Sequence, residues 1–375
     1  MLYRSLVRPA LFRLAPETAH EFALHTLGVA LKTAGARRLV ARRLQREPFG
    51  ALERFGLSFQ NPVGLAAGFD KNGAAVRELA ALGFGFLEVG TVTHLAQPGN
   101  PQPRLFRLSA DRALINRQGF NNEGAAALAA RLSRAGRPPC ILGINIGKSR
   151  AVELPDATAD YLASFDLVHP HADYITINVS SPNTPNLREL QRADALASLL
   201  SALQQRNREL SGRAASGEAA GTPRRVPLLV KIAPDLGDGD LEMIVDVARR
   251  ASVEGIIATN TTVARENLTR TPASVVNAIG AGGLSGAPLR ARSTQVIRAL
   301  YRLSRGTPLK IVGVGGIFNA ADAWEKIRAG ASLLQLYTGF IYEGPTAARD
   351  INEGLAELLR REGFSTLDEA VGSDS

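Results

Sequence analysis

The stretch Leu309-Lys-Ile-Val-Gly-Val-Gly-Gly-Ile317 places a short apolar run directly before closely spaced glycines. Such a run suits a strand that is buried on both faces, and the glycines suit a tight loop at its end. Runs of the same kind recur with helical segments between them, at residues 63–67, 86–90, 141–146, 174–179, 228–232, 255–259, 309–314 and 332–337. Eight strand–helix units over about 275 residues predict a (β/α)₈ TIM barrel of the α/β class.

The rest of the chain divides around this barrel. Of its 375 residues, 45% are hydrophobic and 21% are charged, which is typical of a globular protein. We assign the barrel to residues 48–362, a helical head to 1–47 and an acidic tail to 363–375. Within the barrel, residues 211–225 are rich in Gly, Ser and Ala and predict a flexible surface loop. Cys140 is the single cysteine and the histidines show no metal-binding spacing, so we expect neither a disulfide nor a metal site.

Positive charge is concentrated in the head. The net charge is +9, and residues 1–46 hold nine basic and two acidic residues, a net +7 that leaves +2 for all the others. The pattern predicts two short amphipathic helices, one beginning at Pro16-Glu17 and one at 37–46. Their basic faces could bind an anionic membrane surface, or the helices could cap the barrel with solvated arginines. No segment is typical of a membrane-spanning helix, and the nearly neutral barrel argues against a nucleic acid partner.

Polar residues and glycines gather where the predicted strands end, the face on which barrel enzymes hold their active sites. They are Lys71, Thr91, Asn145, Asn178, Lys231, Asn260, Gly313, Gly315 and Gly316. Residues 143–149 look like a nucleotide-binding phosphate loop, but Gly143 is one residue too close to Gly147-Lys148 for that motif. The glycines at 313–317, together with Tyr337-Thr-Gly339, instead favour binding of a phosphate-bearing cofactor. The alternative is a pair of tight turns.

Two lysines suit a charged or electron-rich ligand. Lys231 lies alone in an otherwise apolar strand, where an ammonium is costly unless it meets an anion or a ring such as a reduced flavin. Lys71, after the first strand, is a second candidate. The alternative for either residue is a side chain that extends to solvent.

Three asparagine-rich segments follow predicted strands, at 116–122, 178–184 and 260–262. Because a carboxamide both donates and accepts hydrogen bonds, several facing one pocket suit a small planar substrate with carbonyl and NH groups. Each segment alone would be explained equally well as a turn.

Taken together, these motifs closely resemble the dihydroorotate dehydrogenases along nearly the whole chain. The segments that carry the resemblance are 66–71, 88–91, 116–122, 143–148, 178–184, 231–235, 258–262, 282–286, 313–317 and 337–339. Ser181, where the soluble branch has cysteine, and the helical head resemble the quinone-dependent, membrane-associated class 2 branch.

The resemblance implies an FMN-dependent oxidoreductase of pyrimidine biosynthesis that oxidises (S)-dihydroorotate to orotate. It implies one FMN per chain, bound by Ala67, Gly68, Lys71, Thr91, Asn145, Asn178, Lys231, Thr259, Gly286, Gly316, Tyr337 and Thr338. It places dihydroorotate against Lys71, Asn116, Arg117, Gln118, Gly119, Phe120, Asn178, Asn183, Asn260 and Thr261. Ser181 would remove the C5 proton while C6 gives a hydride to flavin N5, and Thr184, with Phe120 sealing the pocket, is our hypothesised proton exit.

The resemblance also implies that a membrane quinone accepts the electrons through a tunnel in the head, which His20 and Arg107 would line. It predicts a peripheral protein on the cytoplasmic side of a bacterial inner membrane. Two departures touch no expected ligand contact: His94-Leu95 and the long 211–225 segment.

Two other functions remain open from sequence. A tRNA dihydrouridine synthase is also an FMN barrel with a basic surface, but it would be expected to use a catalytic cysteine, and Cys140 lies before the third strand. A membrane-binding head on an inert barrel would leave the Asn and Lys residues unexplained. An absorbance spectrum separates these possibilities.

Overall fold

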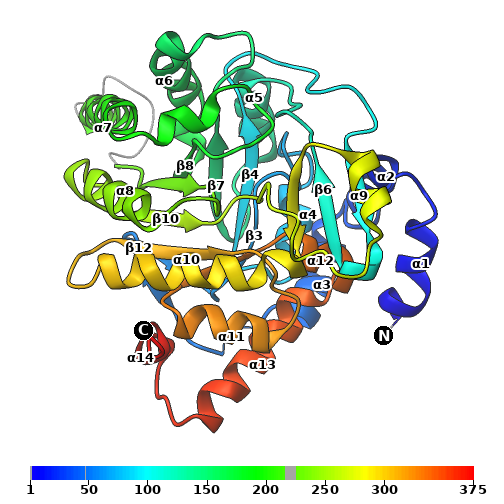
Figure 1. Ribbon diagram of the computed structural model, residues 1–375. Helices are drawn as coiled ribbons and strands as arrows, with labels where there is room; N and C mark the ends of the chain where they lie inside the picture. Colours follow the sequence, from blue (N-terminus) through cyan, green and yellow to red (C-terminus); the bar gives the residue numbers. More distant parts are fainter. Residues whose placement is uncertain (1, 47, 216–224) are drawn as a thin grey trace.

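The computed structural model describes residues 2–46, 48–215 and 225–375, and these contain a closed barrel of eight parallel strands (Figure 1). Each of the eight predicted runs supplies one strand, so the predicted (β/α)₈ fold is confirmed. In barrel order the strands are β3 (Val63–Leu65), β4 (Phe86–Val92), β7 (Ile141–Ile146), β8 (Tyr174–Asn178), β9 (Leu228–Ile232), β10 (Gly255–Ala258), β12 (Lys310–Val314) and β13 (Leu333–Leu336).

The parallel register brings the strand ends to one rim. Asn178 pairs with Lys231 across β8 and β9, and Ala258 pairs with Gly313 across β10 and β12. The predicted polar residues and glycines therefore lie at the same carboxyl-terminal mouth of the barrel.

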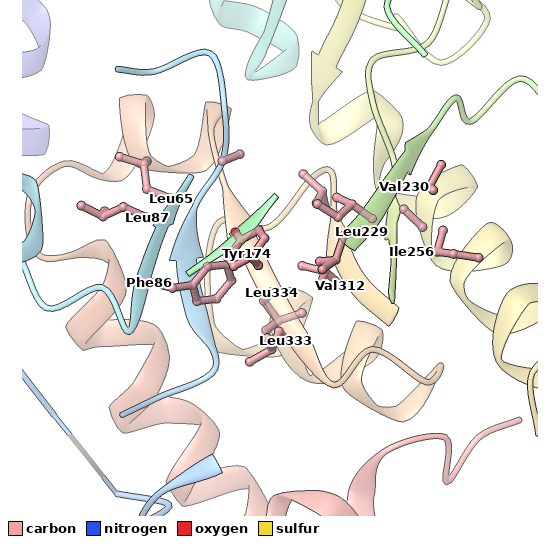
Figure 2. Packing of buried hydrophobic residues seen from close by; sticks show 14 of the residues in the cluster. Leu65, Phe86, Leu87, Tyr174, Leu229, Val230, Ile256, Val312, Leu333 and Leu334 are labelled. Carbon is pink, nitrogen blue, oxygen red and sulfur yellow. The ribbon is translucent and has the colours of Figure 1, made fainter. Parts of the chain in front are cut away.

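Helices surround the barrel and bury its outer face (Figure 1). They are α4 (Val76–Ala80), α5 (Ala125–Ala135), α6 (Ala157–Val168), α7 (Ala193–Ala215), α8 (Asp238–Arg250), α10 (Arg290–Leu303), α11 (Ala320–Arg328) and α13 (Ala347–Arg361). Figure 2 shows the aliphatic and aromatic packing of the strands, in which Phe86 and Tyr174 lie together with ring centroids 6.4 Å apart. Gly143 makes room for Tyr174, because a β-carbon there would lie 2.1 Å from the ring.

A three-stranded antiparallel sheet, which the sequence patterns did not predict, adds to the mouth. Its strands are β5 (Leu105–Leu108), β6 (Ala113–Asn116) and β11 (Gly283–Gly286). A hairpin of β1 (Leu52–Arg54) and β2 (Leu57–Phe59) was also missed, and its Phe59 packs on Phe86 with centroids 5.4 Å apart. Strands of three or four residues carry too little periodicity to be recognised.

The head contains the two predicted helices, α2 (Pro16–Ala30) and α3 (Ala34–Leu44), and one segment more. This is a π-helical turn (Tyr3–Val7) that continues into α1 (Arg8–Leu11). The head docks on the barrel: the Tyr3 hydroxyl donates to the Ile341 carbonyl at 2.6 Å, and Glu17 pairs with Arg104 at 2.8 Å. Across the described ranges, every helix falls short of the length or apolar character that a membrane crossing needs.

Two other segments differ from expectation. Residues 211–215 of the predicted loop belong to α7, and 216–224 lie outside the described residues. The acidic tail is packed against the barrel through α14 (Leu367–Ala370), whose Leu367 is buried, and through the ion pair between Asp368 and Arg54. The remaining elements are α9 (Ala273–Ile279), α12 (Thr338–Glu343) and single 3₁₀ turns at Ser109–Asp111, Leu154–Asp156, His169–His171, Leu187–Gln191 and Ala287–Leu289.

Candidate active site

A polar pocket lies at the carboxyl-terminal mouth of the barrel, where the sequence placed the site. It is lined by most of the expected cofactor residues, namely Ala67, Gly68, Lys71, Thr91, Asn178, Lys231, Thr259, Gly286, Gly316, Tyr337 and Thr338. It is also lined by most of the expected substrate residues, namely Asn116, Gln118, Gly119, Phe120, Asn183, Asn260 and Thr261, and by Ser181. The structure thus brings together side chains that are up to 271 positions apart, from Ala67 to Thr338.

Two expected site residues do not line this pocket. Asn145 is fully buried one layer below it and reaches the pocket through Thr91, whose hydroxyl donates to Asn145 Oδ1 at 2.6 Å. The Arg117 guanidinium turns away, lies 4.8 Å from the centroid of the Phe106 ring and donates to the Pro103 carbonyl at 3.2 Å.

The pocket also includes residues that the sequence reasoning did not assign. Gln335 enters it from the middle of β13, and Ser285 and Leu289 enter it from the β11 side. Gln335 stands alone among apolar neighbours in its strand, which is the same signal that singled out Lys231. Ser285 and Leu289 lie on the unpredicted sheet and the turn after it, where no such signal exists.

The asparagines form a hydrogen-bond network in two groups. Asn178 Nδ2 donates to Thr91 Oγ1 at 2.9 Å, and Asn260 Nδ2 donates to Ser180 Oγ at 3.0 Å. Asn183 Nδ2 donates to Asn116 Oδ1 at 3.1 Å. Because each carboxamide is held at one end, the donor and acceptor atoms that face the pocket are fixed in advance.

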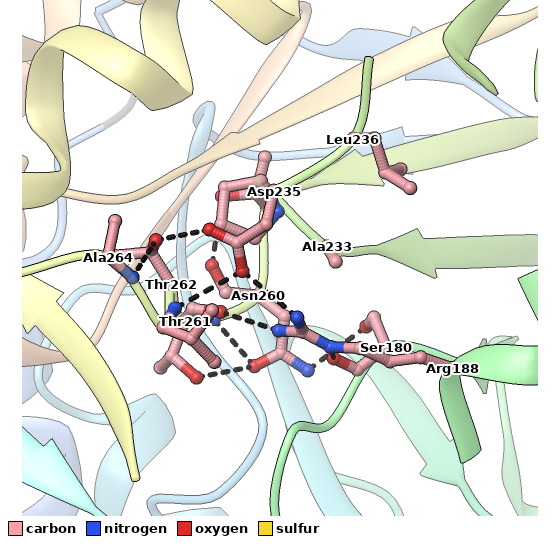
Figure 3. Close-up of polar contacts among 12 residues, drawn as sticks. Ser180, Arg188, Ala233, Asp235, Leu236, Asn260, Thr261, Thr262 and Ala264 are labelled. Carbon is pink, nitrogen blue, oxygen red and sulfur yellow. Dashed lines mark hydrogen bonds and ion pairs between the residues drawn. The ribbon is translucent and has the colours of Figure 1, made fainter. Parts of the chain in front are cut away.

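An ion pair supports this network from outside, as Figure 3 shows. Arg188 Nη1 lies 3.0 Å from Asp235 Oδ2, while the same guanidinium donates to the carbonyls of Ser180 at 3.2 Å and Thr261 at 3.3 Å. Asp235 also accepts from the Val263 amide at 3.2 Å. The loops after β8, β9 and β10 are thereby tied together, a role that their sequence did not reveal.

Ser181 is 5% exposed and lies on the loop after β8. Its Oγ accepts a hydrogen bond from the backbone amide of Asn183 at 3.2 Å, and this bond orients the hydroxyl oxygen. Thr184, on the same loop, has a buried Oγ1 with no hydrogen-bond partner among the described residues. Phe120 is buried against the pocket in the left-handed backbone region, with φ of 54°.

The pocket is electropositive. Lys71 and Lys231 line it, and its lining contains no carboxylate and no histidine among the described residues. Burial, together with the charge of Arg104, lowers the pKa of Lys71 to about 8, and Lys71 Nζ donates to Asn121 Oδ1 at 2.9 Å. Burial also lowers the pKa of Lys231, while the Glu88 carboxylate acts in the opposite direction. This field favours a ligand that carries or develops negative charge.

The pocket fits a phosphate-bearing flavin. The buried Gln335 Oε1 has no hydrogen-bond partner among the described residues, and Lys231 lines the same pocket. At the other end, Thr338 Oγ1 lies 2.8 Å from Ser285 Oγ, beside the glycines at 315, 316 and 339. A β-carbon at Gly339 would lie 1.9 Å from the Ile317 carbonyl oxygen, so backbone packs closely around this end.

A second, mainly apolar cavity of about 370 Å³ lies between the head and the barrel. Both expected tunnel residues, His20 and Arg107, line it. Burial, with the charge of Lys71, lowers the pKa of His20 to about 4, so the ring is neutral at pH 7 and packs edge-on against Phe69 at 4.8 Å. Arg107 donates to the carbonyls of Leu11 and Leu14 and thereby holds the start of the head.

Tyr337 lines both cavities. It follows β13 at the barrel mouth, and burial raises the pKa of its hydroxyl to about 12, so the ring is a neutral wall. Fold and site together give a TIM barrel with a polar pocket at its carboxyl-terminal mouth and a neighbouring apolar cavity, the arrangement in which barrel enzymes bind their ligands.

Comparison with known proteins identifies the family. Residues 51–359 match the family model for dihydroorotate dehydrogenase, and the chain belongs to that family. Relatives named dihydroorotate dehydrogenase (quinone) are 50% identical in Streptomyces coelicolor, over 100% of this chain and 99% of the relative, and 52% identical in Gloeobacter violaceus, over 99% and 98%. These names confirm the resemblance to the quinone-dependent class.

A solved structure supports the same assignment. The crystal structure of the Eimeria tenella dihydroorotate dehydrogenase in complex with ferulenol matches with a TM-score of 0.83 and 38% identity. The match covers 96% of this chain and 95% of that one. The ligand-free Eimeria protein matches with a TM-score of 0.81.

Proposed function

We propose that this chain oxidises (S)-dihydroorotate to orotate in the mouth pocket, with one bound FMN, and that a membrane quinone in the head cavity receives the electrons. The observation that carries this proposal is the shared wall: Tyr337 borders both cavities, so a donor site and an acceptor site meet at one side chain. When bound, FMN would supply the chemistry of hydride acceptance and electron delivery.

The residues that would hold FMN line the pocket from the ends of β3, β4, β8, β9, β10, β12 and β13 and from β11. Lys231 would lie beside the electron-rich end of the ring, and the carboxamide of Asn178 would hydrogen-bond to it. Gly316, Thr338 and Gly339 would hold the phosphate, because backbone amides of glycines approach an anion closely.

Dihydroorotate would lie against the asparagine network. Lys71 would pair with its carboxylate, and Asn116, Asn183 and Asn260 would bind the amide and carbonyl groups of the ring. Arg117 would shape this part of the pocket through its backbone, since its side chain contacts Phe106.

Ser181 is the proposed base for the C5 proton. Serine is a weak base, so it needs an environment that favours its deprotonated form, and the two lysines of the pocket provide a positive field. The partner-free Thr184 Oγ1 would receive the proton on its way out, with Phe120 closing the pocket to bulk water.

The head cavity suits a quinone because its lining is mainly apolar, and the neutral His20 and the cationic Arg107, two of its polar residues, would face the quinone oxygens. Exposed apolar side chains on the head lie among its arginines, namely Leu2, Leu6, Val7, Leu14, Phe22, Val29 and Leu39. This combination would bind an anionic lipid surface, so we propose a peripheral protein on the cytoplasmic side of a bacterial inner membrane.

Two measurements test the proposal. The purified protein should be yellow, release one FMN per chain on heating, and lose its flavin colour when dihydroorotate is added without oxygen. A short-chain ubiquinone should then restore the colour. A colourless protein, or one that dihydroorotate does not bleach, would exclude the proposal.

A further inference from the structure

A carboxylate lies buried beneath the pocket, and the proposed function gives it no role. Glu88 is in the middle of β4 and is 2% exposed. An ionised group in the interior of a barrel is costly unless several donors surround it. Like Lys231, it interrupts an apolar strand.

Four donors from three other strands reach this carboxylate. Oε1 accepts from Asn145 Nδ2 at 2.8 Å. Oε2 accepts from the hydroxyls of Tyr174 at 3.0 Å and Thr176 at 3.2 Å, and from Gln335 Nε2 at 2.7 Å. Both oxygens are thus occupied by donors, which is the arrangement that stabilises the charged form.

This arrangement dictates which way the asparagines face. A carboxylate only accepts, so Asn145 must turn its Nδ2 to Glu88 and its Oδ1 toward the pocket. That oxygen accepts from Thr91 Oγ1 at 2.6 Å and from Asn178 Nδ2 at 3.2 Å. Asn178 therefore turns its own Oδ1 toward Asn260 Nδ2, which lies 3.4 Å away. The orientation of Asn145, Asn178 and Asn260 thus follows from one buried charge.

Glu88 also acts on Lys231. It is the charged group that opposes the effect of burial on the pKa of this lysine. The other titratable groups nearby are Tyr174 beneath the pocket, and Lys71 and Tyr337 in its lining.

We infer that Glu88 is a positioning residue: its carboxylate fixes the carboxamide orientation of Asn145 and Asn178 and is the buried counter-charge to Lys231 beneath the flavin site. The inference rests on the proposed function, because it assigns Glu88 a task toward FMN and dihydroorotate. Glu88 does not itself line the pocket, so removing its charge acts on the flavin environment from beneath, directly through its donor Gln335 and indirectly through Asn145.

The test compares four flavin-loaded proteins: wild type, Glu88→Gln, Tyr174→Phe and the control Glu254→Gln. Glu254 is a partly buried carboxylate at the opposite end of the barrel, where it accepts from the Leu228 amide at 2.8 Å. The midpoint potential of the flavin is measured by spectroelectrochemistry from pH 6 to 10, and the Kd of orotate by titration of the flavin spectrum. Deprotonation of Lys231 should change the slope of the plot of midpoint potential against pH, and the pH of this change is called the break. Lys71 and Tyr337 also affect this plot, and their effects should be the same in all four proteins.

Glu88→Gln should move the Lys231 break to lower pH by one unit or more and raise the Kd of orotate at least tenfold. Tyr174→Phe removes one of the donors to this carboxylate, so the break should move in the same direction as in Glu88→Gln but by less. Glu254→Gln should match wild type in both measurements. A generic effect of neutralising a barrel carboxylate would appear in Glu254→Gln as well.

The inference is overturned if Glu88→Gln keeps the wild-type break and Kd, or if Tyr174→Phe leaves the break in place or moves it to higher pH. If Glu88→Gln does not fold, the Tyr174→Phe result decides alone. A wild-type protein that holds no flavin would instead contradict the proposed function, so the two failures are distinguishable.

Discussion

Filling the head cavity should separate the two half-reactions. Ala23 lines this cavity from α2, and Ala23→Phe would place a benzyl group in a space of about 370 Å³. A buried side chain of that size is worth about 2–3 kcal/mol of apolar contact. If the new ring displaces an equal part of the quinone, the KM for a short-chain ubiquinone should rise by about 30- to 150-fold.

The assay is single-turnover stopped flow without oxygen. Dihydroorotate should reduce the flavin of Ala23→Phe at the wild-type rate, because the mouth pocket does not include Ala23. Reoxidation by quinone should need much more quinone to reach half its maximal rate. Val29→Phe is the matched control, since it adds a ring to an exposed position on the same helix outside the cavity lining. An unchanged quinone KM in Ala23→Phe, or an equal loss in both half-reactions, would refute the assignment of this cavity.

Three further predictions concern single residues. Because the pKa of Lys71 is about 8, kcat/KM for dihydroorotate should fall as pH rises through that value, which a pH profile measures. In Lys71→Met this fall with pH should be absent. The variant should also bind orotate about 10- to 150-fold more weakly, as measured by titration. Burial lowers the pKa of Lys326 from 10.5 to about 7, so the unfolded chain binds this proton more tightly than the folded one and the free energy of unfolding rises with pH. Urea unfolding should therefore show about 2 kcal/mol more stability at pH 8.5 than at pH 7. Lys326→Met should abolish that difference. Gly339→Ala should lower the FMN content per chain, since its β-carbon meets the Ile317 carbonyl at 1.9 Å, whereas Gly28→Ala, with nothing within 4 Å, should not.

The barrel could be predicted because its strands are buried on both faces. Segments such as Ile141–Ile146 therefore appear as continuous apolar runs that need no alternation to be recognised. The antiparallel sheet at the mouth gives no such signal, since β5 and β6 have four residues each and Arg107 interrupts β5. Its strands form because they pair with each other and with Gly283–Gly286, a contact between segments over 150 positions apart.

The site could be located from sequence, but the direction of individual side chains could not. Arg117 follows Asn116 at the end of β6, and neighbouring residues on extended backbone point to opposite sides. Asn116 and Gln118 thus line the pocket while Arg117 packs on Phe106. Asn145 ends one layer too deep to line the pocket because it bonds to Glu88, a partner in another strand that no local pattern reveals.

The head was predicted in part for a similar reason. Pro16 begins α2 as expected, because a proline suits the first helical turn whatever the surroundings. The helical segment from Tyr3 to Leu11 depends on tertiary contacts, such as the Tyr3 hydroxyl bond to Ile341 and the Arg8 bond to the Tyr342 carbonyl. Charged residues interrupt the apolar pattern of this segment, so its apolar face is recognised only from its position on the barrel.

The most direct test of the central claim is the rate of flavin reduction by dihydroorotate in Ser181→Ala, compared with wild type. Ser181 lies in the pocket with its Oγ held by the Asn183 amide. If it is the base, the variant should keep its FMN and bind orotate as tightly as wild type, but its flavin should be reduced about 10²- to 10⁴-fold more slowly in stopped flow. Reduction of the Ser181→Ala flavin at the wild-type rate would contradict the account.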